Sequence, residues 1–167
     1  MDDLRKSNYR RFFFIAFLII LMDFVFKKWM LLLLFEQPKQ IVVTTFFNLT
    51  PVWNNGISFG LMSSQPEVVR FIIPILALLV ITYLISQLKF QGYLQQLASA
   101  IISGGAVGNV IDRILYGKVV DFLDFHIGGY HWPAFNIADV AICTGIAIWV
   151  YAIINTSSTH GGDNAEV

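Results

Sequence analysis

The sequence predicts an all-α membrane protein with four transmembrane helices and a small extracytoplasmic β-sheet with loops. Composition is the first observation behind this prediction. Of the 167 residues, 56% are hydrophobic and only 13% are charged, whereas soluble domains carry about 25% charged residues. The second observation is that four apolar segments are each long enough to cross a bilayer, which takes about 20 residues. The third is that β-branched residues and turn signals gather between these segments.

Charge and cysteine content exclude several function classes. Eleven Lys and Arg residues balance eleven Asp and Glu residues, so the formal net charge is zero and no nucleic-acid-binding surface is predicted. The single cysteine, Cys143, lies in an apolar run, so we expect a packed, inert thiol and no disulfide within the chain. The three histidines, His126, His131 and His160, lack metal-site spacing.

The first predicted span covers residues 12–33. A flank with four Lys and Arg residues precedes it as in a signal peptide. The apolar stretch is too long for one, however, and no small-x-small cleavage site comes after it, so we interpret it as a retained helix. Within the span, Asp23 and Lys27 are four residues apart and share a helix face. Either they neutralise each other while Lys27 and Lys28 extend to the interface, or they act near a site.

Residues 36–67 are expected to form a small sheet outside the hydrocarbon. Ile41–Phe47 is rich in β-branched and aromatic residues. Pro51 and Asn55-Gly56 interrupt the stretch after this run. Since Asn-Gly is the strongest short hairpin signal, a hairpin turn is the plain interpretation of residues 54–56.

The second and third predicted spans cover residues 68–88 and 94–116. In the third span, Gly104-x-x-x-Gly108 predicts a small-residue face for close helix packing. Directly after it, Asn109, Asp112 and Arg113 stand at positions i, i+3 and i+4, so they share one helix face. Contact with a substrate and a structural network are both open interpretations of this polar face.

The last part of the chain holds a loop, a span and a tail. Residues 117–136 contain the strand-like run ValValAspPheLeuAspPhe and a Gly128-Gly129 turn. The fourth predicted span covers residues 137–154. Residues 156–167 are small and polar, and we expect them to be disordered.

Lys and Arg predict the orientation. They concentrate in the N-terminal flank, the linker between the second and third spans has Lys89, and the loop after the third span has only Lys118. The positive-inside rule then predicts that both termini are cytoplasmic. Residues 36–67 and 117–136 would therefore both lie outside.

Asp121 and Asp139 lie at the outer mouths of neighbouring spans. An ionisable group at membrane depth costs roughly 2.5–3.5 kcal/mol on insertion scales, which makes it a functional candidate. Two carboxylates that share a proton supply the two groups that peptide hydrolysis needs, a base to activate water and an acid for the leaving nitrogen. The plainer interpretations are a surface loop acid at Asp121 and, behind an Asn136 cap, a first-turn acid at Asp139. Asp124 is a rival carboxylate, expected on the opposite face of a strand.

The surroundings of the two aspartates predict different protonation. Asp139 is expected in the first turn of a helix, where the positive dipole end favours a carboxylate. Asp121 stands among Val119, Val120 and Phe122, and desolvation there favours its neutral form. We therefore expect Asp139 to act as the base and Asp121 as the acid.

Four motifs stand in order along the chain. They are Asn54-x-Gly56 with Phe59, the run GlyGlyAlaValGlyAsnValIleAspArg at 104–113, GlyLysValValAspPhe at 117–122, and ProAlaPheAsnIleAlaAspValAlaIle at 133–142. Together they cover nearly the whole chain, and the series resembles the lipoprotein signal peptidase family, the signal peptidase II of bacteria. The resemblance implies that Asp121 and Asp139 match the catalytic aspartates. It also implies that further residues match motif positions near the site or in the first span, namely Asn54, Gly56, Asn109, Arg113, Asn136, Asp23 and Lys27.

Such an enzyme would be an aspartyl endopeptidase of the bacterial cytoplasmic (inner) membrane, with its active site at the extracytoplasmic face. It would remove signal peptides from diacylglyceryl-modified prolipoproteins, just before the lipidated cysteine, without a cofactor or metal. Its partners would be these precursors and membrane lipids, and the sequence sets no oligomeric state. Residues 36–67 could cradle the substrate backbone by strand addition.

Two other classes are alternatives to a peptidase. The first is a small proton-coupled transporter, in which Asp23, Asp112, Asp121 and Asp139 would form a relay. Transporters often show an internal repeat, and none is visible here. The second is a structural membrane subunit, in which the acids would tolerate replacement by amides.

Overall fold

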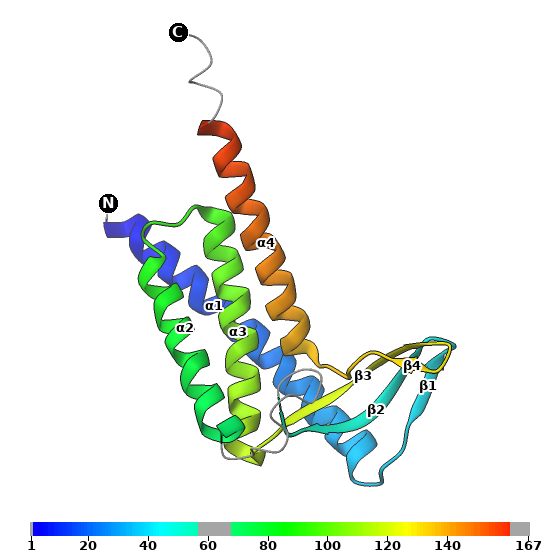
Figure 1. Cartoon of the computed structure of the whole chain (residues 1–167). Helices are drawn as coiled ribbons and strands as arrows, with labels where there is room; N and C mark the ends of the chain where they lie inside the picture. Colours follow the sequence, from blue (N-terminus) through cyan, green and yellow to red (C-terminus); the bar gives the residue numbers. More distant parts are fainter. Residues whose placement is uncertain (1, 57–67, 161–167) are drawn as a thin grey trace.

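A computed structural model describes residues 2–56 and 68–160 of the chain. Within these residues, long helices form a bundle and an antiparallel sheet projects from one end of it (Figure 1). Phe59 of the first motif and residues 161–167 of the polar tail lie outside the described residues. The helical elements are α1 (Asp2–Met30) with its π-helical continuation η1 (Leu31–Phe35), the π-helical η3 (Val68–Ile72), α2 (Ile73–Gln87), α3 (Tyr93–Tyr116) and α4 (Ile137–His160).

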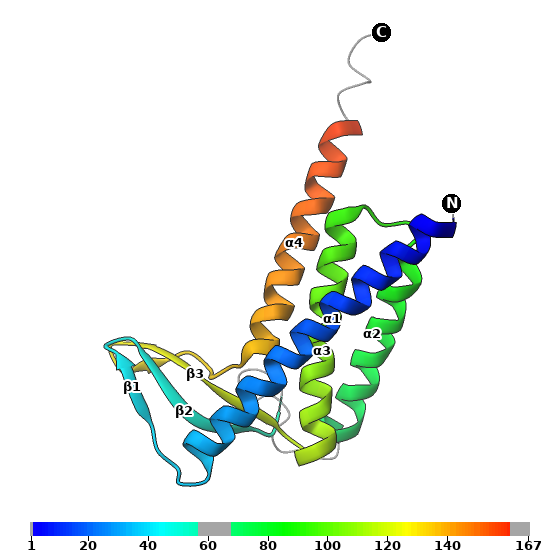
Figure 2. The same cartoon turned by 180° about the vertical axis from the view of Figure 1, so that it is seen from behind.

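Helix α3 is the central element, and α1 crosses it on the face seen in Figure 2. Glycines allow this close approach. A Cβ added to Gly105 would lie 2.5 Å from the Ala138 carbonyl oxygen of α4, and one added to Gly108 would lie 2.5 Å from Asp23 Oδ2 of α1. Both distances are far below van der Waals contact, so only glycine fits. The predicted small-residue face on the third span is therefore confirmed.

Three described helices are long and apolar enough to cross a membrane: Arg70–Gln87, Tyr93–Tyr116 and Ile137–Asn155. Helix α1 is not among them, since Asp23, Lys27 and Lys28 interrupt its apolar stretch. Asp23 and Lys27 are nevertheless only 1% and 2% exposed. The outward surface of α1 consists largely of Phe, Leu and Val side chains.

Among the described residues, the sheet has four strands in the order β1-β2-β3-β4. They are β1 (Ile41–Thr44), β2 (Phe47–Asn54), β3 (Val119–Ile127) and β4 (Tyr130–His131), and each pairs antiparallel with its neighbour. The Gly128-Gly129 turn is confirmed between β3 and β4, where both glycines have positive φ, 56° and 85°. This left-handed backbone favours glycine.

The residues that would complete a hairpin turn at Asn55-Gly56 are 57–67, which lie outside the described residues. The β1–β2 turn lies at residues 45–46, and β2 runs on to Asn54, which pairs with Val119 of β3. The Asn54 side chain accepts a hydrogen bond from the Gly56 amide at 3.0 Å, which shapes the exit from the strand.

Two expectations are corrected by the course of α4. The helix continues to His160, so residues 156–160 are helical rather than disordered. Continuation is physically simple, because each added residue of a formed helix gains one backbone hydrogen bond. Cys143 is exposed rather than packed. Helix α4 buries a narrow stripe that includes Ala138, Ala141 and Ala152, and Cys143 lies off that stripe.

A hydrophobic cluster joins the bundle to the sheet. Met30 and Leu34, at the end of α1 and in η1, pack with Val120 and Phe122 of β3, and all four are buried. These two β3 residues flank Asp121. The cluster thus anchors the segment of β3 that carries this aspartate.

Candidate active site

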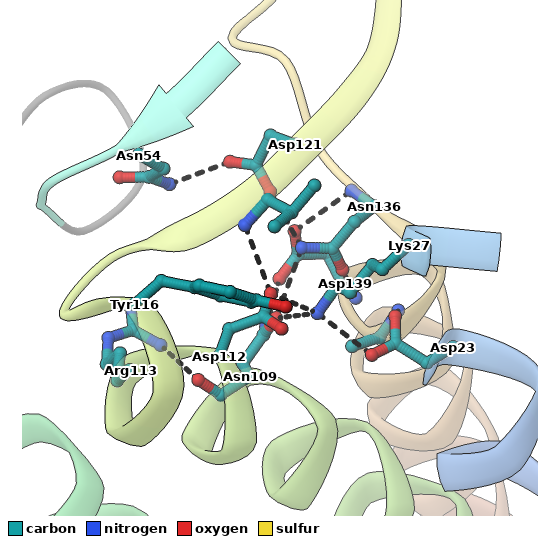
Figure 3. Close-up of polar contacts among 12 residues, drawn as sticks. Asp23, Lys27, Asn54, Asn109, Asp112, Arg113, Tyr116, Asp121, Asn136 and Asp139 are labelled. Carbon is teal, nitrogen blue, oxygen red and sulfur yellow. Dashed lines mark hydrogen bonds and ion pairs between the residues drawn. The ribbon is translucent and has the colours of Figure 1, made fainter. Parts of the chain in front are cut away.

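Most of the buried charged residues, together with buried asparagines, gather where α1, α3 and α4 meet the sheet (Figure 3). Asp121 comes from β3 and is 1% exposed, while Asp139 comes from the first turns of α4 and is half-buried. Backbone pairing brings these elements together. The Phe135 amide donates to the Leu123 carbonyl at 3.1 Å, and the Leu123 amide donates to the Phe135 carbonyl at 2.9 Å. The segment before α4 is therefore fixed beside β3.

Asn136 links the two aspartates directly. Its Nδ2 donates to Asp121 Oδ1 at 2.7 Å. Its Oδ1 accepts from the Asp139 amide at 3.0 Å, and Asp139 Oδ2 accepts from the Asn136 amide at 3.2 Å. This reciprocal pair is a capping box, with Asn136 as the N-cap of α4. The predicted cap is confirmed, and the same side chain also holds Asp121.

Asn109 of α3 provides a second link to Asp139. Its Nδ2 donates to Asp139 Oδ1 at 2.8 Å. Its Oδ1 accepts from Lys27 Nζ at 3.0 Å and from Asn136 Nδ2 at 3.1 Å. An ammonium group only donates hydrogen bonds, so Lys27 forces the oxygen of Asn109 toward itself and the NH2 group toward Asp139. Lys27 thereby sets the direction of the hydrogen bonds that run from Lys27 through Asn109 to Asp139.

Lys27 also lies between two buried acids. Its Nζ is 2.8 Å from Asp23 Oδ2 and 2.9 Å from Asp112 Oδ2. Asp23 Oδ1 accepts from the Ala138 amide in the first turn of α4 at 2.8 Å, and Asp112 Oδ2 accepts from the Val120 amide of β3 at 3.0 Å. The triad therefore holds the backbone beside both aspartates. Asp23 and Lys27 thus neutralise each other and also lie near the site, whereas Lys27 is buried and does not extend to the interface.

Arg113 and Asn54 close the side of the site toward the end of β2. Asn54 Nδ2 donates to Asp121 Oδ2 at 2.9 Å. Arg113 donates from one terminal nitrogen to the Asn109 carbonyl at 3.2 Å and from the other to the Gly56 carbonyl at 3.3 Å. The guanidinium fork thus joins α3 to the residues just after β2. It is Asp112, and not Arg113, that bonds to the strand of Asp121.

The surroundings of Asp121 disfavour its charged form. Burial and, after it, the neighbouring Asp139 carboxylate raise the pKa of Asp121 from 3.8 to about 7, although hydrogen bonds from Asn54 and Asn136 and the charge of Lys27 act in the opposite direction. The described donors to Asp121 are the neutral amides of Asn54 and Asn136, and among the described residues no cation forms an ion pair with it. Asp121 is thus able to hold a proton near neutral pH.

Asp124 belongs to a different cluster on the same strand. Its Oδ1 lies 2.7 Å from His131 Nδ1, and its Oδ2 accepts from Asn48 Nδ2 at 3.2 Å and Thr50 Oγ1 at 3.1 Å. Burial raises the pKa of Asp124, but these hydrogen bonds outweigh it and hold the pKa below its usual value. Among the described residues, none of these three partners of Asp124 also bonds to Asp121 or Asp139. The structure therefore separates the rival carboxylate from the pair.

A pocket of about 650 Å³ opens beside Asp139 and Asn54. Residues 132–135 line one side of it, and Cys143 and Thr144 of α4 line another. Sequence reasoning missed this lining, because an almost uniformly apolar helix gives no signal of which face it buries. Among the described residues, no group of three His, Cys, Asp or Glu side chains is placed to hold a metal ion.

Comparison with known proteins places these observations in a family. A family described as "Signal peptidase (SPase) II" matches residues 15–155. A lipoprotein signal peptidase of Janthinobacterium sp. (strain Marseille) is 45% identical over 140 residues, which cover 82% of this chain and 84% of that protein. A lipoprotein signal peptidase of Francisella tularensis subsp. novicida (strain U112) is 40% identical over 150 residues, which cover 87% and 92%.

Solved structures of bacterial membrane enzymes share the fold. One, determined by the in meso method at 2.3 Å resolution, has a TM-score of 0.75 and 27% identity, and the match covers 94% of this chain and 93% of that one. Another, at 1.9 Å resolution, has a TM-score of 0.70 and 29% identity, with 86% and 92% covered.

Proposed function

This chain belongs to the signal peptidase II family, and on that premise we propose that it removes signal peptides from prolipoproteins in a bacterial membrane. The observation that carries the proposal is the match to curated lipoprotein signal peptidases over more than four fifths of the chain. A proton-coupled transporter is not favoured. Its relay would need charged groups spread through the depth of the bilayer, whereas the buried polar network gathers at one end of the bundle.

The proposed chemistry is that of an aspartic peptidase with Asp121 and Asp139 as the catalytic pair. Asn136 touches both residues, and Asn109 touches Asp139. Two carboxyl groups that contact the same asparagine and repel each other electrostatically favour the form with one shared proton. The raised pKa of Asp121 supports the assignment of the proton to Asp121 and of the negative charge to Asp139.

The proposed reaction then proceeds in two steps. Asp139 takes a proton from water as the oxygen attacks the scissile carbonyl carbon, while Asp121 donates its proton to the carbonyl oxygen, which gives a neutral gem-diol. In the second step, Asp121 takes a proton from one hydroxyl of the gem-diol as the carbonyl re-forms. The C–N bond breaks as Asp139 gives its proton to the leaving nitrogen. One water is consumed, and the pair returns to its starting protonation.

The proposed substrate is a prolipoprotein whose cysteine already carries diacylglycerol, cut just before that cysteine. The pocket beside Asp139 would take the residues that flank the scissile bond. Its mostly apolar lining and its position along the first turns of α4 suit a substrate that arrives from within the membrane. Asn54, Gly56, Asn109, Asp112, Arg113, Asn136, Asp23 and Lys27 would support the pair and its substrate rather than react.

We further propose that α1 is a fourth membrane span. Its two most costly residues, Asp23 and Lys27, are buried and paired with each other, so the bilayer does not meet their charges. With four spans, both termini would be cytoplasmic and the sheet extracytoplasmic. The cations near the N-terminus and Lys89 of the α2–α3 connection lie at the end of the bundle opposite the sheet, as the positive-inside rule requires (Figure 1).

Cysteine labelling of cells tests this orientation. In a Cys143→Ser background, a membrane-impermeant maleimide should label Gln40→Cys, near the sheet, and should miss Phe90→Cys, in the α2–α3 connection. Both positions are exposed in the protein. The reverse labelling pattern would show that the sheet faces the cytoplasm and would contradict the proposed placement of the site.

The activity test uses the purified full chain in detergent. Incubation with a diacylglyceryl-modified prolipoprotein should release the signal peptide, as seen by a mobility shift and by mass spectrometry of the new N-terminal cysteine. The same precursor without the lipid is the substrate control, and the Asp121→Asn protein is the enzyme control. A folded preparation that leaves the lipidated precursor intact would overturn the proposal.

A further inference from the structure

A basic surface surrounds the C-terminal turn of α3, at the end of the bundle that carries the sheet. Lys28 comes from α1, Arg70 from η3, and Lys118 from the connection between α3 and β3. Lys28 Nζ donates to the Tyr116 hydroxyl at 2.9 Å. Arg70 lies beside Gly117, where an added Cβ would be 3.7 Å from Arg70 Cδ. We call Lys28, Arg70 and Lys118 the basic rim.

Two aromatic side chains form the floor between the lysines. Lys118 Nζ lies 4.2 Å from the centroid of the Trp53 ring, and Lys28 Nζ lies 5.6 Å from that of Tyr116. The two rings are 5.6 Å apart, and Trp53 also meets Phe35 edge-on at 4.9 Å. All three rings pack on the cluster that joins the bundle to the sheet. The floor is therefore fixed, and it holds the lysines on either side.

The rim has a surplus of positive charge. Within the described ranges, the ion pairs involve only Lys27 and His131, so no described carboxylate pairs with the rim. The end of α3 supplies roughly half a negative charge through its dipole, which is less than the three cations carry. The Lys28 ammonium has three donors, and the Tyr116 hydroxyl takes one of them.

The position of the rim points to a lipid headgroup. Tyr116 is the last residue of a helix able to cross a membrane, and Trp and Tyr at the ends of spans mark the headgroup level. In the proposed orientation the rim is extracytoplasmic, where Lys and Arg are usually scarce. A cluster of three cations at that level is therefore expected to bind an anionic group. Exposed apolar side chains nearby, Phe24 and Ile114, give acyl chains a surface to follow.

We propose that the basic rim binds the phosphodiester of an anionic phospholipid. The ammonium groups of Lys28 and Lys118 and the guanidinium of Arg70 pair with phosphate oxygens, and the glycerol lies over Trp53 and Tyr116. The acyl chains lie against α1 and α3. This lipid is a resident partner of the fold, and its binding requires no cleavage of any substrate.

Native mass spectrometry of the purified full chain tests the proposal. The protein is equilibrated with equal amounts of dioleoyl phosphatidylglycerol and dioleoyl phosphatidylcholine, and the retained lipids are counted. The wild type should retain the anionic lipid preferentially. Each Lys→Gln change at Lys28 or Lys118 should lower that preference about fivefold, from the typical contribution of one basic residue near an anionic surface. Added salt should lower it as well.

Matched variants separate charge from general damage. Lys89→Gln removes a lysine that lies 4.6 Å from the Phe90 ring at the opposite end of the bundle, and it should keep the wild-type preference. The double change Lys28→Arg and Lys118→Arg preserves both charges and should keep it too. Equal retention of both lipids by the wild type would overturn the proposal. An unchanged preference in a protein that carries both Lys28→Gln and Lys118→Gln would overturn it as well. The readout needs no substrate, so it stands apart from the peptidase test.

Discussion

Asp121 and Asp124 are three residues apart on β3, and both are buried, at 1% and 5% exposure. Burial alone would raise the pKa of each. Asp121 is contacted by neutral amides and faces a second carboxylate, and its pKa rises to about 7. Asp124 is contacted by His131, Asn48 and Thr50, and its pKa falls below the usual value. The partners of a buried acid, together with its burial, thus decide whether it can keep a proton at neutral pH.

Replacement of each aspartate by asparagine gives the largest expected contrast. Asp121→Asn and Asp139→Asn remove the group that exchanges a proton, and each should lower the cleavage rate at least about a thousandfold. Asp124→Asn should change it less than about threefold. Rates are measured on detergent-purified protein with lipidated precursor, and binding of the precursor serves as the folding control. Near-normal cleavage by either variant of the pair would exclude the proposed mechanism.

Removal of the Lys27 charge should have the next largest effect. Lys27→Met leaves Asp23 and Asp112 without their cation and frees Asn109 to rotate its amide. Displacement of a catalytic group by about 1 Å costs up to about a hundredfold, so we expect kcat to fall about 10- to 100-fold and KM to change little. Lys27→Arg keeps the charge and should recover part of the rate. Lys39→Met, at an exposed position, is the control, and an equal loss there would refute the specific role.

The free energy of unfolding should change with pH in opposite directions for Asp121 and Asp124. The pKa of about 7 at Asp121 predicts that cleavage declines as the pH rises above 7, because the neutral acid is lost. The same raised pKa makes the free energy of unfolding fall between about pH 4 and 7, by up to about 1.4 kcal/mol per pH unit.

Asp124, with its lowered pKa, contributes stability above pH 4 that is lost as the pH falls. Thermal unfolding in detergent from below about pH 4 to above about pH 7 checks both trends. Asp121→Asn should remove only the fall in stability as the pH rises toward 7. Asp124→Asn should remove only the loss of stability as the pH falls below about 4. A wild-type profile that Asp121→Asn leaves unchanged would show that another group titrates.

His131→Gln should have the smallest effect. The change removes a partner of Asp124, so the pKa of Asp124 should rise toward its usual value. The His131 side chain is 50% exposed, so the loss of stability should stay below about 1 kcal/mol. Cleavage should remain within about twofold of the wild type. The Asp124 carboxyl signal in a carbon-13 NMR titration measures the shift, and a large loss of activity would mean that the two clusters are coupled.

The sequence predicted the helix cap and the tight turn better than it predicted which distant residues meet at the site. The Asn136 cap and the Gly128-Gly129 turn follow from local rules of helix ends and tight turns, and both are present. The Asn55-Gly56 turn rested on the same kind of rule, but the residues that would complete it lie outside the described residues, and local rules did not indicate that β2 pairs with a strand about 70 residues away. The partners of Asp124 come from two other strands, and such a meeting depends on register, which no local pattern contains.

Faces of apolar helices were equally hidden from the sequence. Helix α4 is apolar over most of its length, and hydrophobic periodicity therefore did not indicate that Cys143 lies beside the pocket. The sequence indicated Lys27 as a candidate because it is a charged residue within a predicted span. Its bond to Asn109, 82 residues away, depends on the close α1–α3 approach that Gly108 permits.

Asn136 performs two tasks with one short side chain. Its oxygen caps α4 and its nitrogen holds Asp121. Serine or threonine would cap the helix but lacks the second donor, aspartate would cap it but repel Asp121, and glutamine would shift both groups by a methylene. Almost no other residue type can therefore replace Asn136 without loss of function. A resistance mutation that reshapes the site around an inhibitor is least accessible here, so an inhibitor that hydrogen-bonds to Asn136 would face the narrowest route of escape.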